Sequence, residues 1–182
     1  MTLEFKPWPK ITRLENRHQK LLFTEKIDGT NGLIYITDDG DMFIGSRNRW
    51  LTEDSDNFGF HHWAIKNKTE LMSLGPGRHH GEWWGSKIQR TYNLPKGERR
   101  FSLFNTNIWN EDNIPTCCHV IPTLYRGEFD TEVIKQVMNE LKKNGSVASP
   151  GFMNPEGVIV YHTSANHYFK VPFDKEHKWT TI

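Results

Sequence analysis

The chain has few cysteines and no long apolar run, and each shortage excludes a class of protein. Its two cysteines, Cys117 and Cys118, are adjacent in the 182-residue sequence. Adjacent cysteines provide no disulfide framework, so a reducing compartment is expected. No apolar run approaches the roughly 20 residues that span a bilayer, and Met1 is followed by no charged-then-apolar leader. We therefore predict a soluble, cytoplasmic protein with no membrane partner.

Net charge is also nearly absent. The formal charge is +1, so no field from the whole molecule draws the chain onto nucleic acid. Any such binding must come from a local cluster, and one lies between Lys87 and Arg100. There is no repeat or low-complexity linker, and the length suits one domain over residues 1–182 without a separate C-terminal domain.

Short β-like runs dominate the pattern, and two helical segments lie between them. One helix is expected over residues 56–74. The other follows Asp130 or Thr131 as N-cap, has an apolar face from Val133 to Leu141, and ends at Gly145 after two lysines. Strands are expected over residues 21–23, 33–37, 41–45, 79–84, 100–105, 120–124, 158–162 and 168–171. This mixture predicts an α+β fold with mainly antiparallel sheet.

The segment Glu25-Lys26-Ile27-Asp28-Gly29-Thr30-Asn31 is the leading candidate for chemistry. It follows the apolar run Leu21–Phe23, so it reads as a strand that stops at a tight turn. Lys26 is therefore expected at the mouth of a sheet. A lysine amine attacks only when it is neutral, which requires burial or nearby cations. Taken alone, a lysine before an Asp-Gly turn is more typical of a hairpin.

Two later segments carry groups that suit a nucleotide. Arg47, in Gly45-Ser46-Arg47-Asn48-Arg49, offers a bidentate fork for phosphate, although a solvated turn is the better explanation of Arg47 taken alone. Glu82 lies in an aromatic strand, where a carboxylate is costly to bury without a partner. A ribose hydroxyl pair or a protein cation would satisfy it.

The next segments add an aromatic ring, a carboxylate and a cation. In Arg100–Asn105, alternation places Phe104 and Ser102 on the face opposite Phe101, where a ring can stack on a purine or pack in the core. Glu156 precedes an apolar strand and can hold a divalent cation. Lys170 lies on the strand expected to pair with it, where it can neutralise a phosphate or form an ordinary cross-strand pair.

The order of these motifs resembles the covalent nucleotidyltransferases: Lys-x-Asp-Gly, Ser-Arg, Gly-Glu, Phe104, Glu-Gly-Val-Ile-Val and Phe-Lys. The segment around Lys26 is most similar to ATP-dependent RNA ligases of the ligase-2 type, including small phage-borne members. Trp8–Ile11 and the Trp-rich stretch Gly81–Tyr92 share this resemblance. Each motif is weak alone, and their joint order carries the comparison.

The resemblance implies an ATP-grasp-like adenylyltransferase domain of antiparallel sheets flanked by helices. Lys26 would attack the α-phosphate of ATP and carry AMP, which it would transfer to a 5′-phosphate end for sealing to a 3′-hydroxyl. Mg²⁺ or Mn²⁺ would neutralise the triphosphate. The remaining roles would be adenine contacts by Thr24 and Glu25, ribose or phosphate contacts by Asn31 and Arg47, ribose binding by Glu82, adenine stacking by Phe104, metal positioning by Glu156 and α-phosphate binding by Lys170.

The partner would be RNA, as a nicked duplex or an RNA/DNA hybrid, and the location the cytoplasm, or the host cytoplasm for a phage-encoded chain. One departure matters, because the last motif normally has two lysines separated by one residue and here only Lys170 matches. Lys175 or Lys178 would then supply the second cation, and the Lys87–Arg100 segment or a partner protein would replace a C-terminal domain. The alternatives are a DNA ligase, an end-adenylating enzyme, or a non-catalytic descendant that binds nucleotide or nucleic acid.

Overall fold

The computed structural model describes residues 20–173, which form two sheets and three α-helices. The four-stranded sheet has the order β7-β1-β8-β9, and the five-stranded sheet has the order β3-β2-β4-β5-β6. All pairs are antiparallel except β5 with β6. The elements are β1 (Lys20–Lys26), β2 (Thr30–Ile36), β3 (Met42–Gly45), α1 (Phe60–Lys66), α2 (Lys68–Leu71), β4 (Gly77–Gly85), β5 (Arg99–Leu103), β6 (His119–Val120), β7 (Thr123–Glu128), α3 (Thr131–Asn144), β8 (Gly157–His162) and β9 (His167–Pro172).

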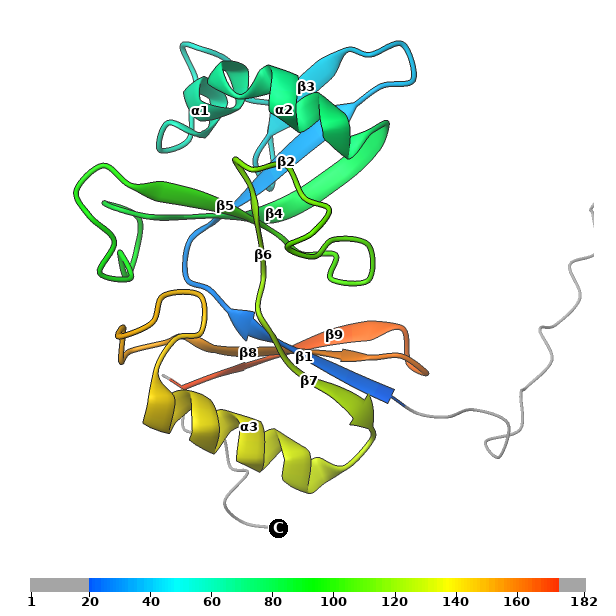
Figure 1. Cartoon of the computed structure of the whole chain (residues 1–182), viewed down its shortest axis with the longest axis vertical. Helices are drawn as coiled ribbons and strands as arrows, with labels where there is room; N and C mark the ends of the chain where they lie inside the picture. Colours follow the sequence, from blue (N-terminus) through cyan, green and yellow to red (C-terminus); the bar gives the residue numbers. More distant parts are fainter. Residues whose placement is uncertain (1–19, 174–182) are drawn as a thin grey trace, which may run out of the picture.

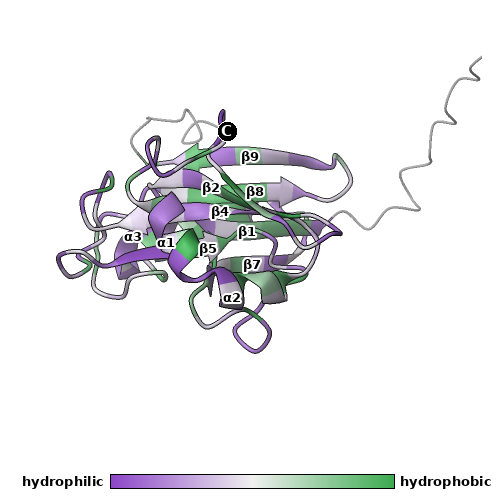
Figure 2. Ribbon diagram, turned by 90° about the horizontal axis from the view of Figure 1, so that it is seen from above, coloured by the Kyte–Doolittle hydropathy of each residue, from purple (hydrophilic) through white to green (hydrophobic). Residues whose placement is uncertain are grey.

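The two sheets are stacked between helices (Figure 1). Helices α1 and α2 cover the outer side of the five-stranded sheet, and α3 covers the outer side of the four-stranded sheet. The chain passes between the sheets in the turn from β1 to β2 and again between β6 and β7. Polar and apolar residues alternate along the strands, as the banding in Figure 2 shows. The α+β prediction is therefore confirmed.

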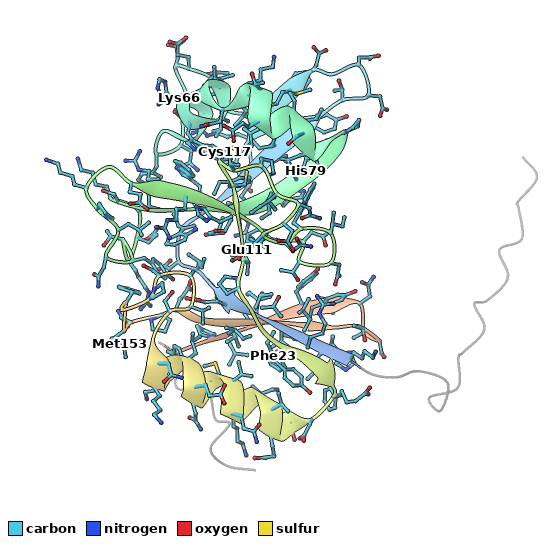
Figure 3. All side chains as sticks on the ribbon, in the orientation of Figure 1. Phe23, Lys66, His79, Glu111, Cys117 and Met153 are labelled. Carbon is cyan, nitrogen blue, oxygen red and sulfur yellow. The ribbon has the colours of Figure 1, made fainter. Side chains whose placement is uncertain are left out.

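The helix predicted after Asp130 is present as α3, and its apolar face packs as expected. Asp130 is the N-cap, and its side chain accepts a hydrogen bond from the Glu132 N–H. Val137 and Leu141 are buried against Leu21 and Phe23 of β1, and Phe23 lies between the sheet and α3 in Figure 3. Alternation along β1 therefore directs its odd-numbered residues to α3 and leaves Leu22, Thr24 and Lys26 on the opposite face.

The other predicted helix, over residues 56–74, is wrong as a single element. Phe58 and Gly59 both have positive φ, so helical geometry begins only at Phe60. Asp56 then accepts hydrogen bonds from the backbone N–H groups of His61 and His62 in the first turn of α1. The helix breaks again at Asn67 before α2, and a 3-10 turn follows over Met72–Leu74.

Seven of the eight predicted strands are present with shifted ends, and two pairs of consecutive strands form hairpins. β2 pairs with β3 around a turn that contains Gly40 at φ 85, and β8 pairs with β9. The strand predicted over residues 120–124 is wrong as one element, because this range holds the end of β6 and the start of β7, which belong to different sheets. Trp8–Ile11, Lys175 and Lys178 lie outside the described residues. Within the described part of the chain, no helix combines the length and apolar character of a membrane span.

Candidate active site

A cavity of about 950 Å³ lies between the facing sides of the two sheets. Thr24, Lys26, Ile159 and Tyr161 line it from the four-stranded sheet, and Asn31, His80 and Glu82 line it from the five-stranded sheet. The segment after β5, from Phe104 to Trp109, forms part of its wall. The cavity therefore collects residues that are up to 146 positions apart in the chain, from Leu22 to Tyr168, but share inward-facing positions on paired strands.

Lys26 is the last residue of β1 and forms an ion pair with Glu156, the residue before β8. The register explains this contact, because Lys26 is paired with Gly157. Less than a quarter of either side chain is exposed, so the pair is screened weakly by solvent. An amine and a carboxylate predicted to serve the same phosphate chemistry thus lie in contact.

The turn after Lys26 is held by three separate partners. The Asp28 N–H donates to the Tyr92 hydroxyl at 2.7 Å, and Arg90 Nε donates to Asp28 Oδ2 at 3.0 Å. The Gly29 N–H donates to Glu82 Oε1 at 3.0 Å. Gly29 itself leaves no room for a side chain, because a Cβ there would lie 2.5 Å from the Trp83 carbonyl oxygen. The Lys-x-Asp-Gly sequence is therefore fixed on the β4 strand, and this fixes the position of Lys26.

Glu82 is a buried carboxylate with two protein donors. Besides the Gly29 N–H, it accepts a hydrogen bond from the Asn31 side-chain amide at 3.2 Å. Burial raises the pKa of Glu82 to about 7, and the hydrogen bond from Gly29 and the charge of Lys26 only partly oppose this. Both donors are neutral groups, and Glu82 also lines the cavity, where its carboxylate can accept from hydroxyl groups.

Glu25 does not present its side chain to the cavity. The carboxylate lies on the α3 side of β1 and is 1% exposed. Its Oε2 accepts hydrogen bonds from the backbone N–H groups of Val147 and Ala148, and burial raises its pKa. Any contact between Glu25 and a base would therefore use its backbone, because its side chain holds the loop that follows α3.

Phe104 lies on the face predicted for it, and Lys170 lies on β9, the strand that pairs with β8 as predicted. Phe104 lines the cavity and is 40% exposed, whereas Phe101 and Leu103 are buried in the core. Cross-strand pairing aligns Thr24, Ile159 and Lys170 in one row across β1, β8 and β9, and residues paired in this way share a face. Lys170 is exposed and stands beyond the residues that line the cavity.

Arg47 does not line the cavity, and the arginines of the Lys87–Arg100 cluster contact other groups of the protein. Arg47 is exposed in the loop after β3, outside the cavity lining. In the cluster, Arg90 pairs with Asp28, Arg99 donates to the carbonyls of Ser86 and Phe58, and Arg100 pairs with Glu98. The arginines of this cluster thus serve the fold, which weakens its prediction as a nucleic-acid site.

The site fits a hard divalent cation that is shared with phosphate oxygens. Among residues 20–173, no group of three or more His, Cys, Asp or Glu side chains could enclose a metal ion. Mg²⁺ is usually held by one or two carboxylates together with substrate phosphates. Glu156, beside Lys26 on the cavity side, is the carboxylate placed for this role.

Sequence reasoning missed three contributors to this site. Tyr92 orders the turn after Lys26 from 64 residues away. Arg78 and His80 line the cavity from β4, and burial lowers the pKa of His80, with Arg78 adding to the effect. The alternation of Arg78, His80 and Glu82 along one strand was the available signal, since every second residue shares a face.

Comparison with known proteins gives a family and a fold. The family model described as RNA ligase matches residues 19–177. No curated protein sequence matches the chain. Among solved structures, the chain is similar to a Naegleria gruberi RNA ligase mutant with AMP and Mn, at 22% identity and a TM-score of 0.64 over 88% of this chain and 51% of that one.

Two further structures of the same ligase match the chain to a similar extent. A mutant with ATP and Mn gives 24% identity and a TM-score of 0.64 over 87% of this chain and 51% of that one. The ligase with PPi gives 24% identity and a TM-score of 0.61 over 88% of this chain and 51% of that one. At this identity the likeness establishes the fold, and the chain spans about half the length of these ligases.

Proposed function

The chain belongs to the RNA ligase family, and we propose that it is an ATP-dependent RNA ligase whose nucleophile is Lys26. The ligase would take AMP from ATP onto Lys26, pass it to the 5′-phosphate of an RNA end, and join that end to a 3′-hydroxyl. The family match over residues 19–177 supports the activity. ATP, AMP and Mn in structures of Naegleria gruberi RNA ligase support the choice of nucleotide and metal.

One observation carries the assignment of the site. Lys26, Asn31, Glu82 and Phe104 line one cavity, although each comes from a different strand or strand end. An amine, an amide, a buried carboxylate and an exposed ring provide a nucleophile, two polar groups for ribose and a surface for a base. Such convergence of polar groups and a stacking ring in a concave site is typical of nucleotide binding.

In the first step, the neutral amine of Lys26 forms a P–N bond with the α-phosphorus of ATP, and the bond to the bridging oxygen breaks to release pyrophosphate. Glu156 holds the Lys26 ammonium in the free protein, so the amine must first lose a proton and leave this pair. The fixed turn at Asp28 and Gly29 keeps Lys26 in line with the cavity. A divalent cation at Glu156 would neutralise phosphate charge when bound.

The next two steps move AMP and then release it. An oxygen of the RNA 5′-phosphate attacks the phosphorus on Lys26, which forms an anhydride and breaks the P–N bond. The 3′-hydroxyl of the second RNA end then attacks the 5′-phosphate, which forms the phosphodiester and releases AMP. We propose a nicked duplex or an RNA/DNA hybrid as the substrate that presents both ends together.

The first experiment asks whether the protein labels itself. It is incubated with α-³²P-ATP and Mg²⁺ or Mn²⁺ and then denatured. We expect label that survives denaturation, is lost in Lys26→Ala, and persists in Lys20→Ala, a lysine at the exposed start of the same strand. Absence of label with either metal would refute the ligase assignment, and equal label in Lys26→Ala would refute the nucleophile.

The second experiment separates RNA ligation from its alternatives. Nicked duplexes are prepared with RNA or DNA on each side of the nick, and sealing is measured after denaturing electrophoresis. We expect sealing when the ends are RNA. Preferential sealing of all-DNA nicks would identify a DNA ligase, and adenylated ends without sealing would identify an end-adenylating enzyme.

A further inference from the structure

An exposed aromatic cluster lies beside the cavity, on the same face of the five-stranded sheet. Its members are Tyr35 on β2, Phe43 on β3 and Trp50 after β3. The ring centroids of Tyr35 and Phe43 are 6.1 Å apart, those of Tyr35 and Trp50 6.2 Å, and those of Phe43 and Trp50 5.9 Å. Phe43 is 47% exposed and Trp50 is 49% exposed, so two large rings remain open to solvent.

Register shows that this cluster continues the wall of the cavity. Tyr35 is paired with Phe43 on one side and with Arg78 on the other. One row further along the same strands, Leu33 is paired with His80, and the next row pairs Asn31 with Glu82. Alternate residues on a strand share a face, so the aromatic cluster and the polar cavity residues face the same way.

Arg78 belongs to both regions. It lines the cavity, and its guanidinium carbon lies 4.5 Å from the Tyr35 ring centroid and 5.8 Å from that of Trp50. A guanidinium over aromatic rings forms a cation–π contact while its charge stays available to an anion. The surface thus offers stacking faces and a positive charge at the edge of the site that would hold AMP.

We propose that Tyr35, Phe43, Trp50 and Arg78 form a stacking surface for the unpaired bases of a single-stranded RNA segment that adjoins the paired ends bound in the cavity. The inference rests on the proposed RNA ligase function and specifies how its substrate is held. Bases stack on aromatic side chains without sequence preference, and arginine contributes through cation–π contact and phosphate binding.

Charge at the borders of the cluster sets the direction of this segment. The turn between β2 and β3 carries Asp38, Asp39 and Asp41, which would repel a phosphate backbone. The loop between β3 and Trp50 contains the exposed Arg47. An RNA strand that leaves the cavity at Arg78 would therefore cross the rings toward Arg47 and away from the turn.

The test measures RNA binding and self-adenylation on the same variants. Binding of a fluorescent single-stranded RNA of about a dozen nucleotides is followed by anisotropy. Phe43→Ala and Trp50→Ala should each weaken binding roughly fivefold to a hundredfold, the range of base–aromatic stacking. Trp50→Phe, which keeps a ring, should bind nearly as the parent does. Phe129→Ala removes a ring of similar exposure, 45%, from the loop before α3 and should change nothing.

Self-labelling with ATP requires no RNA, so it tests the proposed ligase function separately from the proposed RNA-binding surface. Both alanine variants should take label as the parent does. Parental RNA affinity in correctly folded Phe43→Ala and Trp50→Ala would overturn the surface. Unchanged RNA binding with altered sedimentation of Trp50→Ala would assign the rings to a protein partner and would also overturn it. Ring-dependent RNA binding by a chain that takes no label would uphold the surface and refute the ligase.

Discussion

Replacing Glu82 by glutamine is expected to stabilise the protein at high pH while it impairs ATP use. Glutamine has nearly the same shape and keeps an oxygen for the Gly29 N–H, so the turn after Lys26 keeps a partner. It removes a charge that is buried at 9% exposure. The ribose would lose a carboxylate acceptor, and a hydrogen bond to a charged group contributes about 1.5–3 kcal/mol. Self-adenylation at limiting ATP should fall by roughly tenfold or more.

The stability effect follows from the pKa of Glu82. Burial raises it from 4.5 to about 7, so the folded protein binds this proton more tightly than the unfolded chain does. The contribution of Glu82 to the free energy of unfolding is therefore greatest below the unfolded pKa and is lost as pH rises through the folded pKa. At about 1.4 kcal/mol per pH unit, the loss over this window is about 3 kcal/mol.

Glutamine does not titrate, so comparing Glu82→Gln with the parent isolates the stability that Glu82 loses as pH rises. Unfolding by urea is measured for both proteins at intervals between about pH 4 and pH 8. The free energy of unfolding of Glu82→Gln minus that of the parent should increase by about 3 kcal/mol across the series. Other groups titrate in both proteins and cancel. A difference that stays flat, or that falls with rising pH, would refute the burial argument.

The remaining predictions concern the nucleotide, the turn and the core. Lys170→Ala should reduce self-adenylation about tenfold or more if its charge serves a phosphate; near-normal label would show that the lysine motif lies elsewhere. Phe104→Ala should raise the KM for ATP roughly fivefold to a hundredfold by loss of stacking, and an unchanged KM would exclude that role. Tyr92→Phe should lower the free energy of unfolding by about 1–3 kcal/mol, because the Asp28 N–H loses its acceptor; a change confined to activity would contradict this. Leu141→Ala should cost about 2–5 kcal/mol in urea unfolding without altering label per folded molecule, and a loss of label from folded protein would show that α3 acts on the site.

The sequence was most informative where a local pattern dictates a local structure. The α3 helix has a capping Asp130, an apolar face and a glycine after its last turn, and all three signals agree with the structure. Residues 56–74 lacked such agreement, since their periodic apolar residues suggested one helix while the positive φ of Phe58 and Gly59 delays its start. Backbone conformation at a residue such as Phe58 depends on its surroundings, which the local pattern does not contain.

In the candidate site, too, the sequence predicted positions that a local pattern decides and missed those that depend on tertiary contacts. Alternation along β5 predicted that Phe104 lies opposite Phe101, and Phe101 is indeed buried in the core while Phe104, one residue after β5, lines the cavity. The partners of Asp28 could not be anticipated, since Tyr92 and Arg90 are more than 60 residues away and adopt their positions through tertiary packing. For the same reason, the basic character of Lys87–Arg100 suggested an RNA surface, although Arg90 and its neighbours are engaged within the fold.

The single lysine of the last motif can be related to the geometry of β9. Pairing across β8 aligns Lys170 with Thr24, Tyr168 with Leu22 and Pro172 with Lys26. The residues two positions to either side of Lys170 share its face, so a second lysine at either would also face the inter-sheet space. Tyr168 instead packs against Tyr161, with the ring centroids 4.6 Å apart, and lines the cavity, and Pro172 carries no charge. On this face, β9 therefore provides one lysine where the motif normally has two. Among the described residues, Arg78 on the opposite sheet is the arginine that lines the cavity, so it would offer a cation to phosphate from across the site.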